Sequence, residues 1–264
     1  MDKIIIVKII KISFKKFKKS VFFIEIIYFN SYIALKLHCV YLKFMSIKIN
    51  YSNKLTSKSS TNLVLFVDEK FDITSLKKFV SNSEFFYIAD LLKNSDLKKE
   101  LLIFEVNSKR KVFLVSIKKD IKISDIENLG AKFHSYIDHD DGKEYFINSD
   151  TINNKIKNFI GYFIHGLKLK SYEFNIYKSQ KNKKIVTINV IGNKNKISTQ
   201  DHLRFKALEE GSFFARDLVS EPGNILHPDE YAKRINTLKK FGLKINIYDE
   251  KKLKKLGMNA LLGV

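Results

Sequence analysis

An uninterrupted apolar run, Leu63-Val-Leu-Phe-Val67, limits the possible folds of this chain more than any other feature of its sequence. A strand with one solvent-facing side alternates apolar and polar residues, so five consecutive apolar residues indicate a strand buried on both faces of a sheet. Burial on both faces requires a layer of helices on each side of that sheet. The run therefore predicts the α/β class.

Strand and helix patterns alternate from about residue 60 to residue 191. We expect further strands at 101–106, 112–117, 172–177 and 185–191, and helices at 75–80, 85–92, 124–136 and 151–166. The short linker after residue 106 suits a hairpin between the first two of these strands. This mixture of elements predicts a compact three-layer domain.

The chain changes character after the polar linker 193–196. Ser198 and Asp201 have the spacing of a capping box, which predicts the start of a helix that ends at Pro222. The expected core-facing stripe of this helix is Leu203, Ala207, Gly211, Phe214 and Leu218. A glycine inside a helix is costly, so Gly211 indicates a close backbone approach.

The last elements have the pattern of the beginning of a larger α/β sheet. Pro228 at a first helical position predicts a helix that runs to Gly242, and Asp249 can cap a short helix that ends at Gly257. Strands are expected at 243–248 and 260–264.

The first 44 residues differ from the rest, since they combine nine lysines with long apolar stretches. Their apolar run at 20–29 is interrupted by Glu25 and is shorter than the roughly 20 residues that a membrane span needs. No small-residue cleavage site follows it. We expect that residues 1–44 do not belong to the native protein and that it begins at Met45. A membrane or export segment and a genuine domain element are the alternatives.

The charge is strongly positive, at +20, but 44 lysines accompany only four arginines. Nucleic-acid surfaces rely on arginine for bidentate contacts to phosphate and guanine, for which lysine is the poorer substitute. Abundant Lys, Ile, Asn, Phe and Tyr are typical of an AT-rich genome, so we interpret the charge as compositional drift and keep a polyanion-binding face as the alternative. Cys39 is the single cysteine, which excludes an internal disulfide and agrees with a reducing cytoplasm.

Two segments near the C-terminus resemble the cytosol (leucyl) aminopeptidase family, whose members depend on zinc or manganese. They are Ala215-Arg-Asp-Leu-Val-Ser-Glu-Pro-Gly-Asn-Ile-Leu-His-Pro228 and Leu253-x-x-Leu-Gly-Met-x-Ala-Leu-Leu-Gly-Val264. A weaker similarity covers 163–178, near the end of the family's N-terminal domain.

The resemblance implies a domain order. It divides the chain into a leader at 1–44, a macro-like α/β N-terminal domain at 45–195 and the incomplete beginning of an α/β catalytic domain at 196–264. The family's enzymes are cytoplasmic homohexamers that use two divalent metal ions, Mn or Zn, to remove N-terminal amino acids from peptides.

The family's metal ligands and catalytic arginine follow a glycine-rich turn that has no counterpart in these residues. The resemblance therefore assigns no catalytic, cofactor-binding or metal-binding residue, and we expect the 264-residue chain to be inactive and to bind no metal ion. Glu221, His227 and Asp229 lie near matched positions, but we interpret them as turn and helix-start residues. The acidic run 138–142 is interpreted as a solvated turn rather than a calcium loop.

Two other functions remain open on the sequence. The chain could be a basic macro-like binding module for nucleotide-type ligands or nucleic acid, although no phosphate-binding glycine loop supports this, or it could be a structural remnant. We expect no membrane partner and no specific nucleic-acid partner.

Overall fold

The computed structural model describes residues 47–52, 61–138, 142–179 and 185–263. The chain forms two compact units, of which one covers residues 44–213 and the other has its described part at 214–263. The expected leader at 1–44, the start at Met45 and the centre of the acidic run lie outside the described residues. No helix among the described residues is long and apolar enough to span a membrane.

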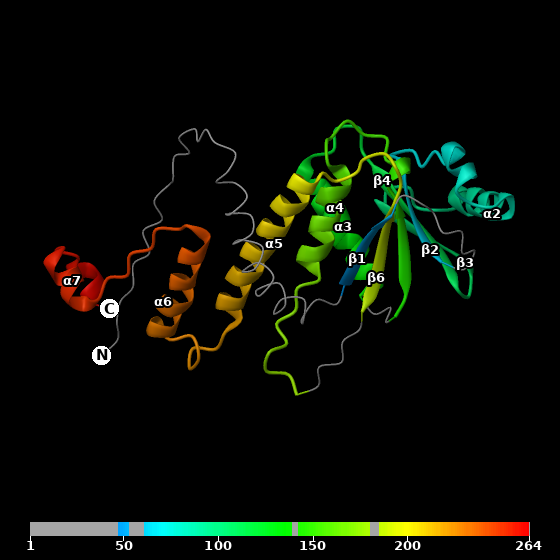
Figure 1. The fold of residues 1–264 in the computed structure, drawn as a ribbon. Coiled ribbons are helices and arrows are strands. Elements are labelled where there is room, and N and C mark those ends of the chain that lie inside the picture. The colour runs from blue at the N-terminus through cyan, green and yellow to red at the C-terminus, as the bar shows by residue number, and fades with distance from the viewer. Residues whose placement is uncertain (1–46, 53–60, 139–141, 180–184, 264) are drawn as a thin grey trace. The chain divides into compact units, whose positions relative to one another are not determined.

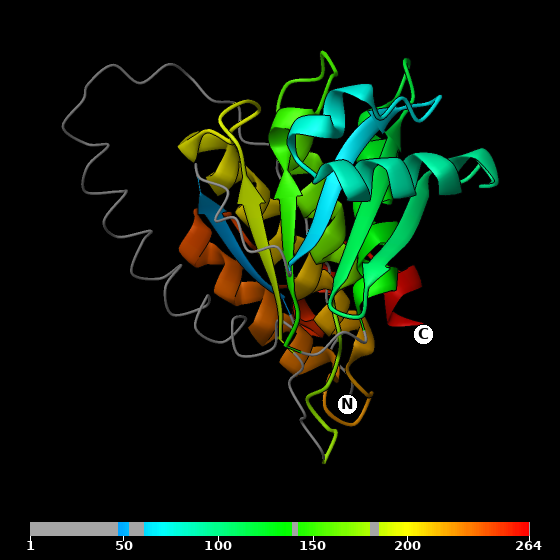
Figure 2. The same cartoon turned by 90° about the vertical axis from the view of Figure 1, so that its right-hand side faces the viewer.

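The first unit is built on a six-stranded sheet with the strand order β1-β6-β5-β2-β4-β3, which Figure 2 shows nearly face-on. Every neighbouring pair is parallel except β3 and β4, which form the expected hairpin. The strands are β1 (Ile47–Ser52), β2 (Asn62–Asp68), β3 (Leu101–Asn107), β4 (Arg110–Ile117), β5 (Glu144–Asn148) and β6 (Val186–Ile191). The central β2 is buried along all but its last residue, which confirms the α/β prediction.

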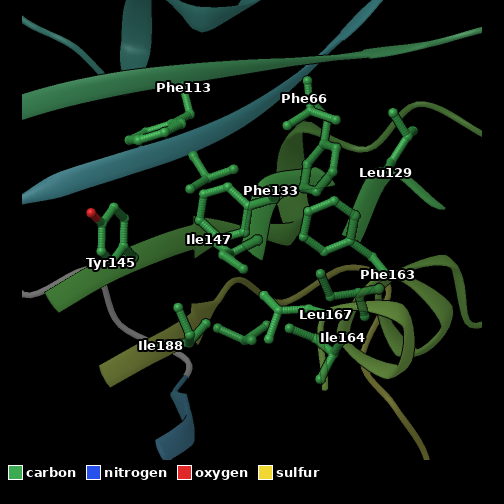
Figure 3. Packing of buried hydrophobic residues seen from close by; sticks show 14 of the residues in the cluster. Phe66, Phe113, Leu129, Phe133, Tyr145, Ile147, Phe163, Ile164, Leu167 and Ile188 are labelled. Atoms are coloured by element: carbon green, nitrogen blue, oxygen red, sulfur yellow. The ribbon is translucent and has the colours of Figure 1, made fainter. Parts of the chain in front are cut away.

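Helices cover both faces of this sheet (Figure 1). One face carries α3 (Ile123–Ile137) and α4 (Phe159–Lys170), and the other carries η1 (Thr74–Lys78) and α2 (Asn82–Lys93). Aromatic side chains fill the first interface: Phe66 of β2 meets Phe163 with ring centroids 5.3 Å apart (Figure 3). Phe113 of β4 meets Phe133 of α3 in the same edge-to-face way at 5.4 Å.

The crossing of α3 and α4 depends on two glycines. A Cβ atom on Gly130 would lie 1.9 Å from the carbonyl oxygen of Phe163, and one on Gly166 would lie 1.9 Å from that of Glu127. Neither distance is sterically possible, so the absence of a side chain at both positions lets the two backbones touch.

The helix expected at 151–166 is wrong in its first half, since α4 begins only at Phe159. Asparagine side chains compete with the helix there: Asn154 accepts a hydrogen bond from the Ile156 amide, and Asn158 adopts a left-handed conformation at φ 61°. Ile152 is nevertheless buried, so its expected burial is correct, although the helical conformation expected around it is wrong.

The strand expected at 172–177 is also wrong, because these residues are irregular and leave Ile176 and Tyr177 exposed. A strand must pair its backbone groups with a neighbour. The edges of the described sheet are β1 and β3, and neither pairs with this segment.

Helix α5 (Thr199–Ser220) begins as predicted, since the Asp201 amide donates to Ser198 Oγ at 3.1 Å. Its expected core stripe is wrong. The buried residues are Phe205, Glu209 and Phe213, whereas Leu203 is 61% exposed. The cause lies in α4, where Gly161 leaves room for the Phe205 ring; a Cβ at Gly161 would lie 2.4 Å from that ring.

The second unit contains α6 (Pro228–Asn236), η3 (Thr237–Phe241), α7 (Glu250–Lys255) and η4 (Asn259–Leu262). One predicted helix end and one predicted helix start are confirmed. Gly242, which follows η3, is left-handed at φ 81°. The Asp249 carboxylate caps the start of α7, where it accepts from the Lys252 amide at 2.9 Å. The strands expected at 243–248 and 260–264 are wrong, since the first segment is irregular and the second contains η4. The described residues 214–263 include no strand with which either could pair.

Candidate functional site

Glu221, the first of the polar residues near the family motif, is part of an ion-pair network. Its side chain is only 5% exposed, and Arg234 Nη1 donates to Glu221 Oε1 at 2.8 Å. Arg234 Nε also donates to Glu230 at 3.2 Å, and this hydrogen bond holds the pKa of Glu230 below its usual value. Both carboxylates raise the pKa of Arg234. Glu221 therefore fastens the end of α5 to α6 within this segment.

His227 and Asp229 occupy the start of α6. His227 is the N-cap residue in an extended conformation, and its carbonyl accepts from the Tyr231 amide at 2.9 Å, while its side chain makes no capping bond. Asp229 stands in the first turn, where the helix dipole favours a carboxylate. These positions agree with the interpretation of both residues as helix-start residues.

Asp229 also lines an open cavity of about 640 Å³ between α6 and α7. Its charged lining comprises Asp229, Asp249, Lys251, Lys252 and Lys255. The Asp249 carboxylate is engaged as the cap of α7. Three lysines against two carboxylates make the cavity basic, so it does not have the donor set of a divalent metal site.

The acidic residues that follow Lys196 do not converge on one point. They are Asp201, Glu209, Glu210, Asp217, Glu221, Asp229, Glu230, Asp249 and Glu250. In the part of the chain that the structure describes, no group of three or more His, Cys, Asp or Glu side chains could hold a metal ion. Asp249 caps α7, the Asp201 carboxylate accepts from Ser198 Oγ at 2.6 Å at the start of α5, and Glu250 pairs with Lys254 at 2.7 Å.

A buried polar contact between α4 and α5 was missed by the sequence analysis. Lys168 Nζ lies 2.9 Å from Glu209 Oε2, and these side chains are 16% and 7% exposed. Next to them the ring of Tyr51 meets His202 edge-on at 5.9 Å. Desolvation and then Glu209 raise the pKa of Tyr51 to about 12, although its side chain keeps considerable exposure. The position of Glu209 between Phe205 and Phe213, four residues from each, was the signal that could have revealed its burial.

A second contact joins α3 to α4 beside this pair. His165 Nδ1 lies 2.8 Å from Glu127 Oε1, and the His165 ring packs on Phe205 of α5 with centroids 5.5 Å apart. Each pair sets a basic side chain against one carboxylate, Lys168 against Glu209 and His165 against Glu127. Their geometry holds three helices together.

The C-terminal segment of the chain is similar to a known protein family. Residues 213–264 match the cytosol aminopeptidase family, catalytic domain. The probable cytosol aminopeptidase of Sinorhizobium medicae is 40% identical over 114 residues, and that of Phytoplasma mali is 41% identical over 109 residues. Each match covers 39% of this chain and 22% of the relative, so the chain spans about a fifth of the length of these relatives.

Solved structures show that the fold is shared. A tomato leucine aminopeptidase mutant superposes with a TM-score of 0.63 at 16% identity, covering 80% of this chain and 46% of that one. A bottromycin maturation enzyme in complex with Mn gives a TM-score of 0.52 at 13% identity, covering 75% of this chain and 40% of that enzyme. The mixed α/β sheet is therefore similar in fold to leucine aminopeptidase, and the C-terminal segment 213–264 is the part of the chain that matches the cytosol aminopeptidase family.

Proposed function

We propose that these residues form the N-terminal part of a metal-dependent leucyl aminopeptidase. Residues 45–195 would be its macro-like N-terminal domain and residues 196–264 the beginning of its catalytic domain. The observation that carries this proposal is the family match at 213–264, which continues from α5 through α6 and α7. The complete enzyme would remove N-terminal amino acids from peptides in the cytoplasm as a homohexamer.

The chemistry of the complete enzyme would depend on two divalent ions, Mn or Zn, which activate a water molecule and bind the substrate's amine. A two-metal site needs several carboxylates that converge on one point. The described residues bring no such group together, so they do not fit a catalytic metal pair. We therefore assign no catalytic, cofactor or metal role to any residue of this chain, and we propose that the 264 residues alone have no peptidase activity.

The test is an assay of the purified chain on leucine p-nitroanilide with Mn²⁺ or Zn²⁺, with bound metal measured in parallel. The probable cytosol aminopeptidase of Phytoplasma mali serves as the full-length control. We expect no turnover above a metal-free blank and less than one bound metal ion per chain. Turnover, or two metal ions per chain, would contradict the proposal and require ligands among residues outside the described ranges.

A genetic measurement tests the family side of the proposal independently. Reading the nucleotides that follow the Val264 codon in all three frames should show a glycine-rich turn and then a segment that carries lysine and aspartate. A sequence without either in any frame would count against a relationship to a complete aminopeptidase gene.

A further inference from the structure

Strand β3 is an open edge of the sheet in the first unit, with β4 as its only neighbour among the described strands (Figure 2). The Ser116 amide donates to the Glu100 carbonyl across this pair, and the antiparallel register then runs without a shift as far as Glu105. Bonded residues alternate in such a pair, so the even-numbered residues of β3 turn their backbone groups toward β4. Leu101, Ile103 and Glu105 therefore turn their N–H and C=O groups outward.

The ring of Tyr87, from α2, lies on this outward side. Its Oη donates to the Glu105 carbonyl oxygen at 3.4 Å, as expected for a carbonyl that does not bond to β4. One hydroxyl leaves the second lone pair of that oxygen available. Tyr87 is 45% exposed, and Leu97, just before β3, is 44% exposed. The open edge therefore has apolar surface beside it.

The sequence of β3 does not protect this edge from pairing. Edge strands of native proteins are usually protected by lysine, by proline or by a bulge. At the opposite edge of the sheet, β1 carries Lys48 within the strand. The sequence of β3, LLIFEVN, contains neither lysine nor proline, and its one irregularity follows Glu105. Residues 101–105 are thus a regular template to which another strand can add.

The outward groups of β3 are complementary to those of a second β3. They are spaced symmetrically about Ile103, so a two-fold axis there would bond Ile103 to its copy and Leu101 to Glu105 of the second copy. Every outward N–H and C=O of the regular segment then has a partner. Glu105 comes diagonal to Lys99 of the second copy, whereas a parallel pairing in register would oppose two Glu105 carboxylates.

We infer that β3 is an interface between two copies of this chain, which pair antiparallel about Ile103 and join their sheets into one. The elements that carry this inference, β3, β4 and α2, all belong to the first unit. The inference does not depend on the proposed function.

Disulfide trapping tests the pairing directly. All variants carry Cys39→Ser, which removes the natural cysteine. In Ile103→Cys the two Cα atoms would lie about 5.5 Å apart, within the range of a disulfide. Glu105→Cys, two residues along the same strand, is the matched control, because the two copies of this position would lie about 14 Å apart. Tyr136→Cys, at a position of α3 that is 52% exposed, reports random collisions.

The 264-residue chain is oxidised mildly, and the covalent dimer is followed by non-reducing electrophoresis. We expect Ile103→Cys to form this dimer at least about tenfold faster than either control, because pairing holds its two thiols together. Equal rates at Ile103 and Tyr136 would overturn the inference, whether β3 stays open or is covered by another segment. Faster trapping of Glu105→Cys would overturn the register.

Sedimentation equilibrium measures the association without a cross-link. The parent chain should approach twice its 30.8 kDa mass as its concentration rises. Ile103→Pro removes one outward N–H and leaves the bonds to β4, so we expect its dissociation constant to rise at least about tenfold. Tyr136→Lys should dissociate as the parent does. A parent chain that is monomeric at every concentration, or a folded Ile103→Pro with an unchanged dissociation constant, would overturn the inference.

A charge reversal covers the case in which Ile103→Pro fails to fold. The Glu105 side chain is 70% exposed, so Glu105→Lys should leave the fold intact, as urea unfolding would verify. It places like charges beside Lys99 of the second copy and should weaken the dimer, and adding Lys99→Glu should restore it. A dissociation constant that neither change moves would contradict the antiparallel pairing about Ile103.

Discussion

Lys168 and Glu209 are the most buried oppositely charged pair between two helices of the first unit. Removing one partner leaves an uncompensated charge, so Lys168→Met should lower the free energy of unfolding by about 3 kcal/mol. The double variant Lys168→Met/Glu209→Leu should recover most of that loss, because an apolar pair of similar volume needs no charge compensation. Urea unfolding of the three proteins measures both effects. If the double variant were no more stable than the single one, the loss of stability in Lys168→Met could not come from the uncompensated charge of Glu209.

His134 on α3 gives the stability a pH dependence. Its side chain is 5% exposed, and burial lowers its pKa, with Lys170 acting in the same direction and Asp138 and Glu173 opposing. The unfolded chain therefore takes up a proton at a higher pH than the folded protein does, so stability falls as the pH drops below the ordinary histidine value of about 6.5.

His134→Gln should reduce this loss of stability between pH 7 and about pH 5, as measured by the urea midpoint at each pH. His227→Gln, at an exposed position, is the matched control. An unchanged slope in His134→Gln would refute the role of His134.

At the scale of elements, the glycines of α4 and α5 predict opposite responses to alanine. Gly166→Ala would place a methyl group against the Glu127 carbonyl of α3 and force the two helices apart, so we expect a loss of about 2 kcal/mol despite the better helix propensity of alanine. Gly211→Ala meets no atom within 4 Å outside the neighbouring backbone of its own helix and should stabilise the chain by about 0.5–1 kcal/mol. Thermal unfolding compares them. Changes of the same sign would contradict the close crossing of α3 and α4.

Elements whose cause is local could be predicted from the sequence. The apolar run of β2, the turn of the β3–β4 hairpin and the Asp249 cap of α7 each rest on neighbouring residues, and each is present. The strands expected at 172–177, 243–248 and 260–264 failed because a strand depends on a partner, which no local pattern specifies. On α5 the apolar stripe was recognised, but the face that packs on α4 is chosen by Gly161, some 40 residues earlier. Once that face is chosen, the burial of Glu209 follows, because Glu209 lies four residues from both Phe205 and Phe213.

At the scale of the whole molecule, the positive charge is carried by lysines, whereas the arginines are engaged in contacts within the protein. Arg110 Nε lies 2.8 Å from Glu84, Arg234 pairs with Glu221, and Arg204 bonds to Tyr162. Bidentate recognition of guanine or phosphate depends on free guanidinium groups. These contacts favour the interpretation of the charge as compositional drift over a specific nucleic-acid surface.

Binding to duplex DNA should accordingly be weak, independent of sequence and governed by salt. Lysines that contact phosphates release counterions, so an affinity that they provide should fall steeply, by about a thousandfold for six or more contacts, between about 50 and 200 mM salt. Fluorescence anisotropy with two duplexes of equal length and different sequence measures the dissociation constants across this range, and a titration with ADP-ribose under the same conditions tests a nucleotide pocket. We expect equal constants for the two duplexes at each salt concentration and no saturation with ADP-ribose. Discrimination between the duplexes that survives 200 mM salt would refute compositional drift as the origin of the +20 charge, because nonspecific lysine contacts cannot distinguish sequences.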